Sequence, residues 1–203
     1  MNSREIVVYL NEAETQCRMA IGAVIALNNA MQADSKSEDG TQDWDRFRFM
    51  QGEIFRSLHS LLTHASNISR IFWPPVGRGQ KAEIRGRRGV VLRQKVGLPD
   101  EDHPLHKRTL RDHLEHFDER IDHWRETSIR KNYAQDLVGP KGMIAGFEET
   151  DMMRWYDPER KCFMFRGEEF DIQELVTAIE ALRPMLSQVI EREELEARRG
   201  ASS

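Results

Sequence analysis

Apolar residues recur along the first third of this chain at alternating spacings of three and four, which is the pattern of an amphipathic helix. The first run predicts a helix from about Arg4 to Gln32, and no proline interrupts it. Its apolar face would consist of Ile6, Leu10, Ala13, Cys17, Ala20, Val24, Leu27 and Met31. A stripe that persists over so many turns indicates a helix that packs in a bundle.

The second run predicts a helix from about Trp44 to Phe72, which ends before Pro74 because proline lacks a backbone donor and crowds the preceding turn. The polar residues 33–42 should form an exposed loop, with Thr41 or Asp43 as the cap of this helix. Two long helices joined by a short loop predict an antiparallel helical hairpin. The apolar face of the second helix would consist of Trp44, Phe47, Gln51, Ile54, Leu58, Leu61, Ala65, Ile68 and Phe72.

Glycine and basic residues are frequent in residues 74–103, which we expect to form a basic loop. Within it, residues 89–98 are compatible with a short helix that has Val91, Lys95 and Leu98 on one side. A third amphipathic helix should run from about Pro104 to Thr127, because proline suits the first turn of a helix. Its apolar face would consist of Leu110, Leu114, Phe117, Ile121 and Trp124.

Aromatic residues on both sides of the turn-forming residues 157–160 predict a β-hairpin over about 151–167. Asp171 should cap a final helix, which Pro184 should kink or divide, and the tail at about 197–203 should fray. The sequence therefore predicts one mostly α domain over residues 1–203. The expected architecture is an up-and-down four-helix-type bundle with a small β-hairpin before the last helix.

Composition agrees with a single domain, since 203 residues can bury a substantial core without disulfides. No apolar stretch is long enough to span a membrane and no signal peptide is recognisable, so we expect a cytoplasmic protein. Cys17 and Cys162 do not form a metal-spaced pair, and we interpret them as reduced packing residues.

Basic residues cluster in one segment although the net charge of the chain is -4. From Val76 to Lys95, seven basic residues face the single acidic Glu83, which leaves a net charge of +6. Such a segment can collect phosphate groups, but a solvated basic loop would have the same composition. The candidate nucleic-acid-binding residues are Arg85, Arg87, Arg88, Arg93, Lys95, Lys107 and Arg108.

Histidines concentrate in and just before the third predicted helix, where five of the seven lie between His103 and His123. A merely solvated helix face would sooner carry lysine and glutamate, which are better helix formers. This cluster is therefore the first place to look for chemistry. His59 and His64 border the apolar stripe of the second helix, and we interpret them as histidines that a neighbouring helix satisfies.

Within the cluster, the sequence Arg111-Asp112-His113-Leu114-Glu115-His116 resembles the motif of the HEPN superfamily, an arginine followed after four to six residues by a histidine. HEPN proteins are helical bundles, and many are metal-independent RNases of toxin–antitoxin, CRISPR and anti-phage systems. The predicted order of helices is similar to theirs. The resemblance implies RNA as the substrate, no cofactor, a homodimer that brings two motifs to one cleft, and a possible cognate antitoxin or defence-system partner.

The resemblance also implies roles for single residues. Arg111 would neutralise charge on the scissile phosphate, and His116 would be the general base or acid at the ribose hydroxyl or the leaving oxygen. Asp112 would orient this pair. On a regular helix Arg111 and His116 would lie about 140° apart, so either the helix start is distorted or a second subunit completes the site. The supporting residues would be His113, Glu115 and Arg120.

Two other classes of function remain open. One is a metal-binding helical bundle, since carboxylates and imidazoles at helix spacing can share a metal ion. Its ligands would be Asp112, His116, Glu119 and His123. The other is a catalytically inactive bundle that binds nucleic acid or a protein partner.

Overall fold

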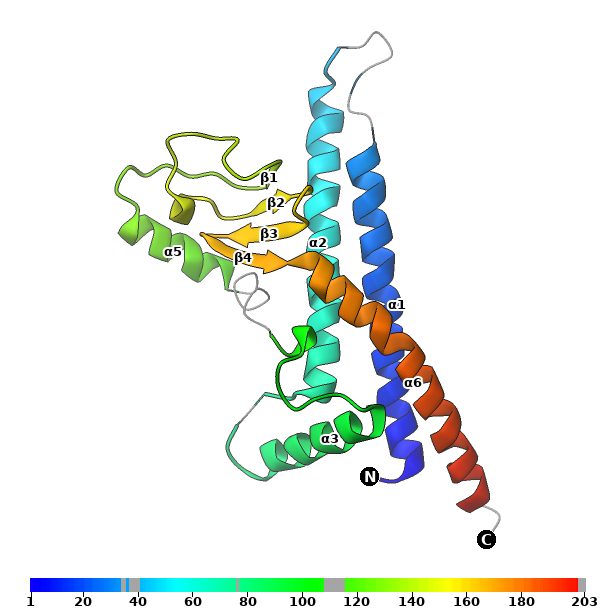
Figure 1. The fold of residues 1–203 in the computed structure, drawn as a ribbon. Helices are drawn as coiled ribbons and strands as arrows, with labels where there is room; N and C mark the ends of the chain where they lie inside the picture. The colour runs from blue at the N-terminus through cyan, green and yellow to red at the C-terminus, as the bar shows by residue number, and fades with distance from the viewer. Residues whose placement is uncertain (34–35, 37–40, 76, 108–115, 201–203) are drawn as a thin grey trace. The chain divides into compact units, whose positions relative to one another are not determined.

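The computed structural model describes residues 1–33, 36, 41–75, 77–107 and 116–200. The chain divides into two compact units, one of residues 1–22, 61–108 and 175–203 and the other of residues 23–60 and 109–174. Helices α1 (Ser3–Gln32), α2 (Trp44–Phe72) and α6 (Ile172–Gly200) each contribute residues to both units (Figure 1). As predicted, the chain is mostly helical, with a small sheet before the final helix.

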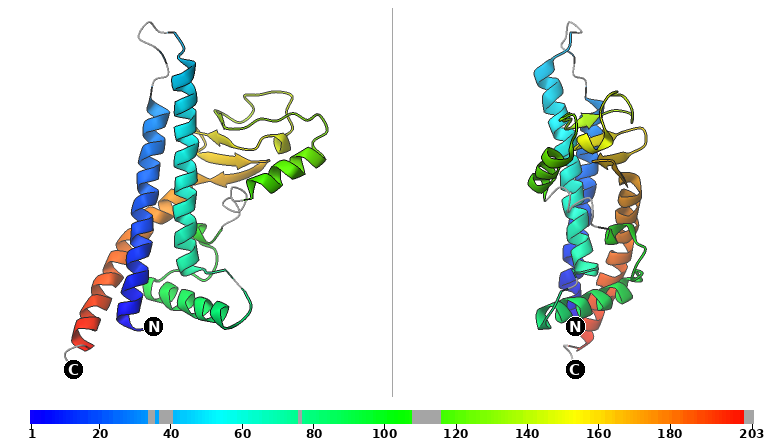
Figure 2. Two further views of the ribbon diagram at one scale, coloured as in Figure 1. Left: turned by 180° about the vertical axis from the view of Figure 1, so that it is seen from behind. Right: turned by 90° about the vertical axis from the view of Figure 1, so that its left-hand side faces the viewer.

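The predicted pair of long helices is confirmed, and α1 and α2 run side by side in Figure 1 and in the left view of Figure 2. Helix α2 has the predicted bounds, and α1 begins at Ser3, one residue earlier than predicted, and ends at the predicted Gln32. Asp43 caps α2, because its Oδ1 accepts hydrogen bonds from the backbone N–H groups of Asp45 at 3.1 Å and Arg46 at 2.9 Å. Of the predicted loop, residues 34–35 and 37–40 lie outside the described part.

The apolar stripes of these helices are buried over most of their length, with two local differences. Near the end of α1 the buried positions are Ala23 and Ala30 instead of the predicted Val24 and Met31. At the start of α2, Trp44 and Phe47 are 64% and 40% exposed, although both were expected in the core. Their rings contact each other edge to face at 5.9 Å. The buried stripe of α2 therefore begins after its first two turns.

In the first unit, polar contacts join neighbouring helices around an apolar core. His64 Nδ1 lies 2.8 Å from Gln16 Oε1, which links α2 to α1 and confirms the interpretation of His64 as a packing histidine. Lys95 Nζ lies 2.6 Å from Glu193 Oε1, which links α3 (Gln80–Val96) to α6. The largest fully buried side chains of this unit are Leu10, Leu61, Ile68, Phe72, Leu92, Leu105, Ile179 and Leu182.

Much of the predicted basic loop is helical, which corrects the sequence prediction. Helix α3 spans Gln80–Val96 and buries Leu92, Arg93 and Val96 instead of the predicted Val91, Lys95 and Leu98. It ends at Gly97, whose φ of 81° is left-handed, and the N–H groups of Gly97 and Leu98 both donate to the carbonyl of Arg93. This is a Schellman-type end, for which glycine is the favoured residue.

The predicted helix from Pro104 to Thr127 is not continuous, so this prediction is wrong at its N-terminal end. Residues Pro104–His106 form a single 3-10 turn (η1), capped by the His103 side chain, which accepts the N–H of Leu105 at 3.2 Å. Lys107 is extended, with φ −70° and ψ 120°. Helix α5 then spans Phe117–Thr127.

The second unit contains a four-stranded sheet in the order β1-β2-β3-β4. The predicted hairpin is confirmed as the antiparallel pair β2 (Trp155–Asp157) and β3 (Cys162–Phe165). Two outer strands were missed: β1 (Leu137–Val138) pairs parallel to β2, and β4 (Glu168–Asp171) pairs antiparallel to β3. Neither gave a signal, because β1 has two residues and β4 is largely acidic and exposed.

Helix α6 begins as predicted, since Asp171 Oδ1 accepts the N–H of Glu174 at 2.8 Å. Of the two predicted effects of Pro184, a kink or a division, the division is wrong, because the helix continues to Gly200. The expected fraying of the tail at about 197–203 stays a prediction. Leu186 and Val189 remain buried beyond the proline, and this packing holds the helix together across it. No helix among the described residues is long and apolar enough to cross a membrane.

Candidate functional site

The HEPN-like motif lies at the edge of the described part of the chain. Arg111, Asp112, His113 and Glu115 lie outside the described residues, as does the nearby Arg108. His116 is described and immediately precedes α5. Of the motif residues, only His116 therefore has described surroundings.

His116 is the cap residue of α5, and its φ of −107° and ψ of 41° are not helical. The described helix begins only at Phe117, so the angle of about 140° expected between Arg111 and His116 on a regular helix stays a prediction. Its side chain is 54% exposed, and its Nδ1 lies 3.2 Å from Glu119 Oε1. An exposed imidazole beside a carboxylate can exchange a proton with a ligand at its other nitrogen.

The residue after His116 anchors the start of α5, a helix that buries none of its own residues. The ring of Phe117 meets the ring of Phe165 on β3 edge to face at 6.0 Å. The Arg154 guanidinium lies 4.9 Å from the centroid of the Phe117 ring. One turn further along, Arg166 donates a hydrogen bond to the Arg120 carbonyl at 2.9 Å. Contacts of Phe117 and Arg120 thus fix the helix that carries His116.

Arg154 is the centre of a partly buried group that we call the Arg154 cluster, which consists of Arg154, Asp136, Gln51, Phe55 and His59. Arg154 Nε lies 2.7 Å from Asp136 Oδ1, and a second guanidinium nitrogen donates to Asp136 Oδ2 at 2.9 Å. Gln51 donates a hydrogen bond to the Asp136 carbonyl, and the Phe55 ring lies 5.9 Å from the guanidinium.

The electrostatic setting of His59 reflects its place in this cluster. Burial and then the positive charge of Arg154 lower the pKa of His59, while Asp136 partly opposes this shift. His59 is therefore held neutral, and the Arg154 charge is satisfied by Asp136. We therefore assign the Arg154 cluster a structural role.

Sequence reasoning missed the cluster because Asp136 and Arg154 lie in segments without a regular pattern and 18 residues apart. One signal was present: Gln51 occupies a position in the apolar stripe of α2, and a polar residue there requires a buried partner.

The four residues of the alternative metal site do not form one cluster in the described part of the chain. His116 contacts Glu119, whereas His123 Nδ1 lies 3.5 Å from Thr127 Oγ1. Asp112 lies outside the described residues. Among residues 1–33, 36, 41–75, 77–107 and 116–200, no three metal-ligating side chains are grouped so that they could hold an ion.

The basic residues of α3 have two kinds of environment. Arg93 is 8% exposed, donates to Asp100 Oδ1 at 2.6 and 3.0 Å and to the Phe72 carbonyl, and so holds the end of α2. Lys95 pairs with the buried Glu193. We therefore assign structural roles to Arg93 and Lys95.

Arg85, Arg87 and Arg88 instead line a pocket of about 520 Å³ between α3 and the start of α1. Lys107 is exposed beyond η1, and Arg108 lies outside the described residues. Three of the predicted nucleic-acid-binding residues thus come together at one hollow.

The chain matches no protein-family model, no curated protein and no solved structure. No relative therefore contributes a function, and the HEPN resemblance rests on residues 111–116 and the helical fold alone.

Proposed function

We propose that this protein is a metal-independent endoribonuclease of the HEPN type that works as a homodimer in the cytoplasm. The observation that carries the proposal is the setting of His116, an exposed imidazole with Nδ1 3.2 Å from Glu119 Oε1. A carboxylate at one ring nitrogen fixes the tautomer and the orientation of the imidazole. The other nitrogen, Nε2, is then the one that faces a ligand.

In the proposed reaction, the ribose 2′-oxygen attacks the adjacent phosphorus and the bond from phosphorus to the 5′-oxygen breaks. His116 accepts the proton of the 2′-hydroxyl, and Arg111, oriented by Asp112, stabilises the charge on the phosphoryl oxygens. In a dimer, the second His116 supplies the proton that the leaving 5′-oxygen takes up. The products are a 2′,3′-cyclic phosphate and a 5′-hydroxyl. A cognate antitoxin or defence-system partner would regulate such an activity.

The test is cleavage of a mixed RNA pool in EDTA by the wild type, His116→Ala and His123→Ala. His123 is the matched control, because it is an exposed histidine of α5, the helix that His116 precedes. We expect the wild type and His123→Ala to leave 2′,3′-cyclic phosphate ends. His116→Ala should be slower by about 10²- to 10⁴-fold, the usual contribution of a general acid or base.

Equal cleavage by the wild type and His116→Ala would contradict the role of His116. Absence of cleavage by the wild type, with or without divalent metal, would contradict the RNase proposal. Cleavage that requires divalent metal would contradict the metal-independent mechanism.

A second candidate function is a nucleic-acid-binding module without catalysis. The gathering of Arg85, Arg87 and Arg88 at one pocket favours it, because arginines bind phosphates through a rigid fork of donors. Tight RNA binding by a wild-type protein that does not cleave would support this function over the RNase.

A further inference from the structure

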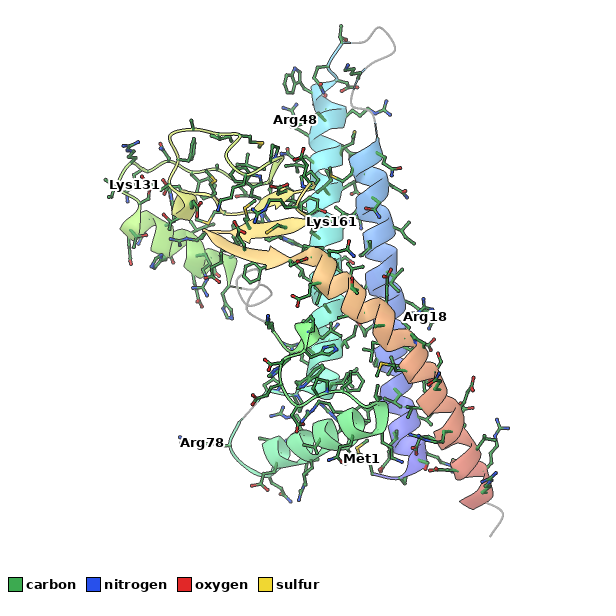
Figure 3. All side chains as sticks on the ribbon, in the orientation of Figure 1. Met1, Arg18, Arg48, Arg78, Lys131 and Lys161 are labelled. Carbon is green, nitrogen blue, oxygen red and sulfur yellow. The ribbon has the colours of Figure 1, made fainter. Side chains whose placement is uncertain are left out.

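The pocket between α1 and α3 has a composition that phosphate binding alone does not require. Met1 lies beside α3 in Figure 3, and the pocket holds about 520 Å³, within the range of roughly 300–1,000 Å³ typical of small-molecule sites. We call this hollow the arginine pocket. Its lining residues are Met1, Glu5, Tyr9, Ile84, Arg85, Arg87, Arg88 and Val91.

Three α3 residues of the arginine pocket, Ile84, Arg88 and Val91, share one face of the helix, since they follow spacings of four and three. Arg85 and Arg87 lie on the two sides of that face. Arg88 builds the wall: its guanidinium lies 5.0 Å from the centroid of the Tyr9 ring and donates to the Arg70 carbonyl at 2.8 Å. Arg88 is thereby fixed in place, with its charge at the pocket.

Arg85 and Arg87 are exposed and make no hydrogen bond or ion pair with any of the described residues. Their guanidinium groups are therefore available to a ligand. Glu5 is the acidic lining residue, and it is already used in the cap of α1. Its carboxylate accepts the N–H of Asn2 at 2.9 Å, and its own N–H donates to Asn2 Oδ1 at 3.0 Å, the reciprocal arrangement of a capping box.

The arginine pocket thus combines three arginines and one engaged glutamate with an apolar surface. Ile84 is 52% exposed, and Val91 and the Tyr9 ring lie at the same hollow. A ligand that matches both features has a negative charge next to a flat apolar group. A nucleotide has this chemistry, with its phosphate beside its base.

We propose that the arginine pocket binds one unpaired nucleotide of single-stranded RNA, with the phosphates on its two sides on Arg85 and Arg87 and the base against Tyr9 and Ile84. The identity of the ligand as RNA rests on the proposed function. Single strands are favoured because the base faces in a duplex are covered by stacking, so only an unpaired base can enter a pocket. The arginine pocket therefore selects unpaired regions of the RNA.

The test measures anisotropy of a short fluorescein-labelled single-stranded RNA with proteins that all carry His116→Ala, so that cleavage does not interfere. We expect Arg85→Gln/Arg87→Gln to weaken binding at least tenfold at low salt. It should also flatten the dependence of log affinity on log salt concentration, by about 0.7 for each phosphate that the protein no longer neutralises. Ile84→Ser should weaken binding of the single strand and leave that slope unchanged.

The matched control is Arg198→Gln/Arg199→Gln, which removes the same charge from exposed arginines of α6. It should bind like the parent protein. Equal weakening by this control, or equal loss of duplex binding in the pocket variants, would reduce the arginine pocket to a general electrostatic patch and overturn the proposal. Arginine-dependent binding to anionic vesicles but not to RNA would also overturn it.

The two proposals fail separately. Pocket-dependent binding of single strands by a wild-type protein that never cleaves RNA would refute the RNase and leave the nucleotide pocket standing. Cleavage that depends on His116 but not on Arg85, Arg87 or Ile84, with unchanged binding, would refute the pocket and leave the RNase standing.

Discussion

The carboxylate of Glu193 is fully buried and lies 2.6 Å from the ammonium group of Lys95, which is 35% exposed. Burial by itself would raise the pKa of Glu193, but hydrogen bonds from Lys95 and Ser3, and the charges of Lys95 and Arg192, lower it overall. The carboxylate therefore stays ionised inside the first unit only because its partners are present.

Removal of Lys95 should therefore leave the buried carboxylate of Glu193 without its ion-pair partner. We expect Lys95→Met to lower the free energy of unfolding by about 2–3 kcal/mol, measured by urea denaturation. Lys81→Met is the control on the same helix, and it should change stability by less than about 0.5 kcal/mol because Lys81 is exposed. The double variant Lys95→Met/Glu193→Leu should recover part of the loss, since it buries no charge. Equal stability of Lys95→Met and Lys81→Met would contradict the structural role of the pair.

Two glycines of α3 should respond to the same substitution with opposite signs. A Cβ at Gly89 would lie 2.6 Å from Pro74 Cδ and 2.7 Å from the Phe72 carbonyl oxygen, so Gly89→Ala should destabilise by about 1–3 kcal/mol. A Cβ at Gly86 would meet nothing within 4 Å, so Gly86→Ala should stabilise by about 0.5–1 kcal/mol. Thermal unfolding of both variants checks this, and a stabilising Gly89→Ala would rule out the close approach of α3 to the end of α2.

The ring of Trp73 is stacked on His103 at 5.1 Å and on His106 at 5.7 Å, with Arg93 6.0 Å from its centroid. Burial and then the proximity of His106 lower the pKa of His103 below its ordinary value of 6.5. The folded state thus favours neutral His103. The stability it contributes is present above about pH 6.5 and is lost as the pH falls through the lowered pKa.

His103→Asn should weaken this pH dependence. Asparagine keeps a side-chain acceptor for the Leu105 N–H but does not titrate. We expect the loss of stability between about pH 7 and pH 5 to be smaller in the variant than in the wild type, measured by urea denaturation at each pH. An unchanged loss would assign the effect to the other histidines with lowered pKa, His59 and His64.

Arg154 connects the sheet to the start of α5, so replacing Arg154 should loosen the helix next to His116. Arg154→Met leaves Asp136 without its partner and removes the cation from the rings of Phe55 and Phe117. We expect the free energy of unfolding to fall by about 3 kcal/mol and amide exchange in α5 to become faster. Arg154→Lys should restore little of this stability, since lysine cannot make the two parallel contacts with a carboxylate. Arg160→Met, at a more exposed ion pair, is the control, and equal exchange in both variants would contradict the anchoring role.

The sequence was sufficient for the elements whose own residues carry a long apolar stripe. The bounds of α2 and the caps at Asp43 and Asp171 follow from such local signals. Only the C-terminal part of α3 was anticipated, as a short helix over residues 89–98, because α3 packs partly through Arg93 and Lys95, and side chains of that kind look solvated in a sequence. The Arg154 cluster was missed because its members meet only through the fold. The polar Gln51 within the apolar stripe of α2 was the one sequence signal for it. The predicted partner of His116, Arg111, remains a prediction.

Both cysteines of the chain are buried and reduced. Burial raises the pKa of Cys17 to about 12 and also raises the pKa of Cys162, so neither is a thiolate at neutral pH. The folded wild type should therefore react very slowly with maleimides. A cysteine introduced at an exposed position such as Arg87 would be labelled selectively, without replacement of the native cysteines. A fluorophore or spin label can thus be placed at the arginine pocket in an otherwise native chain.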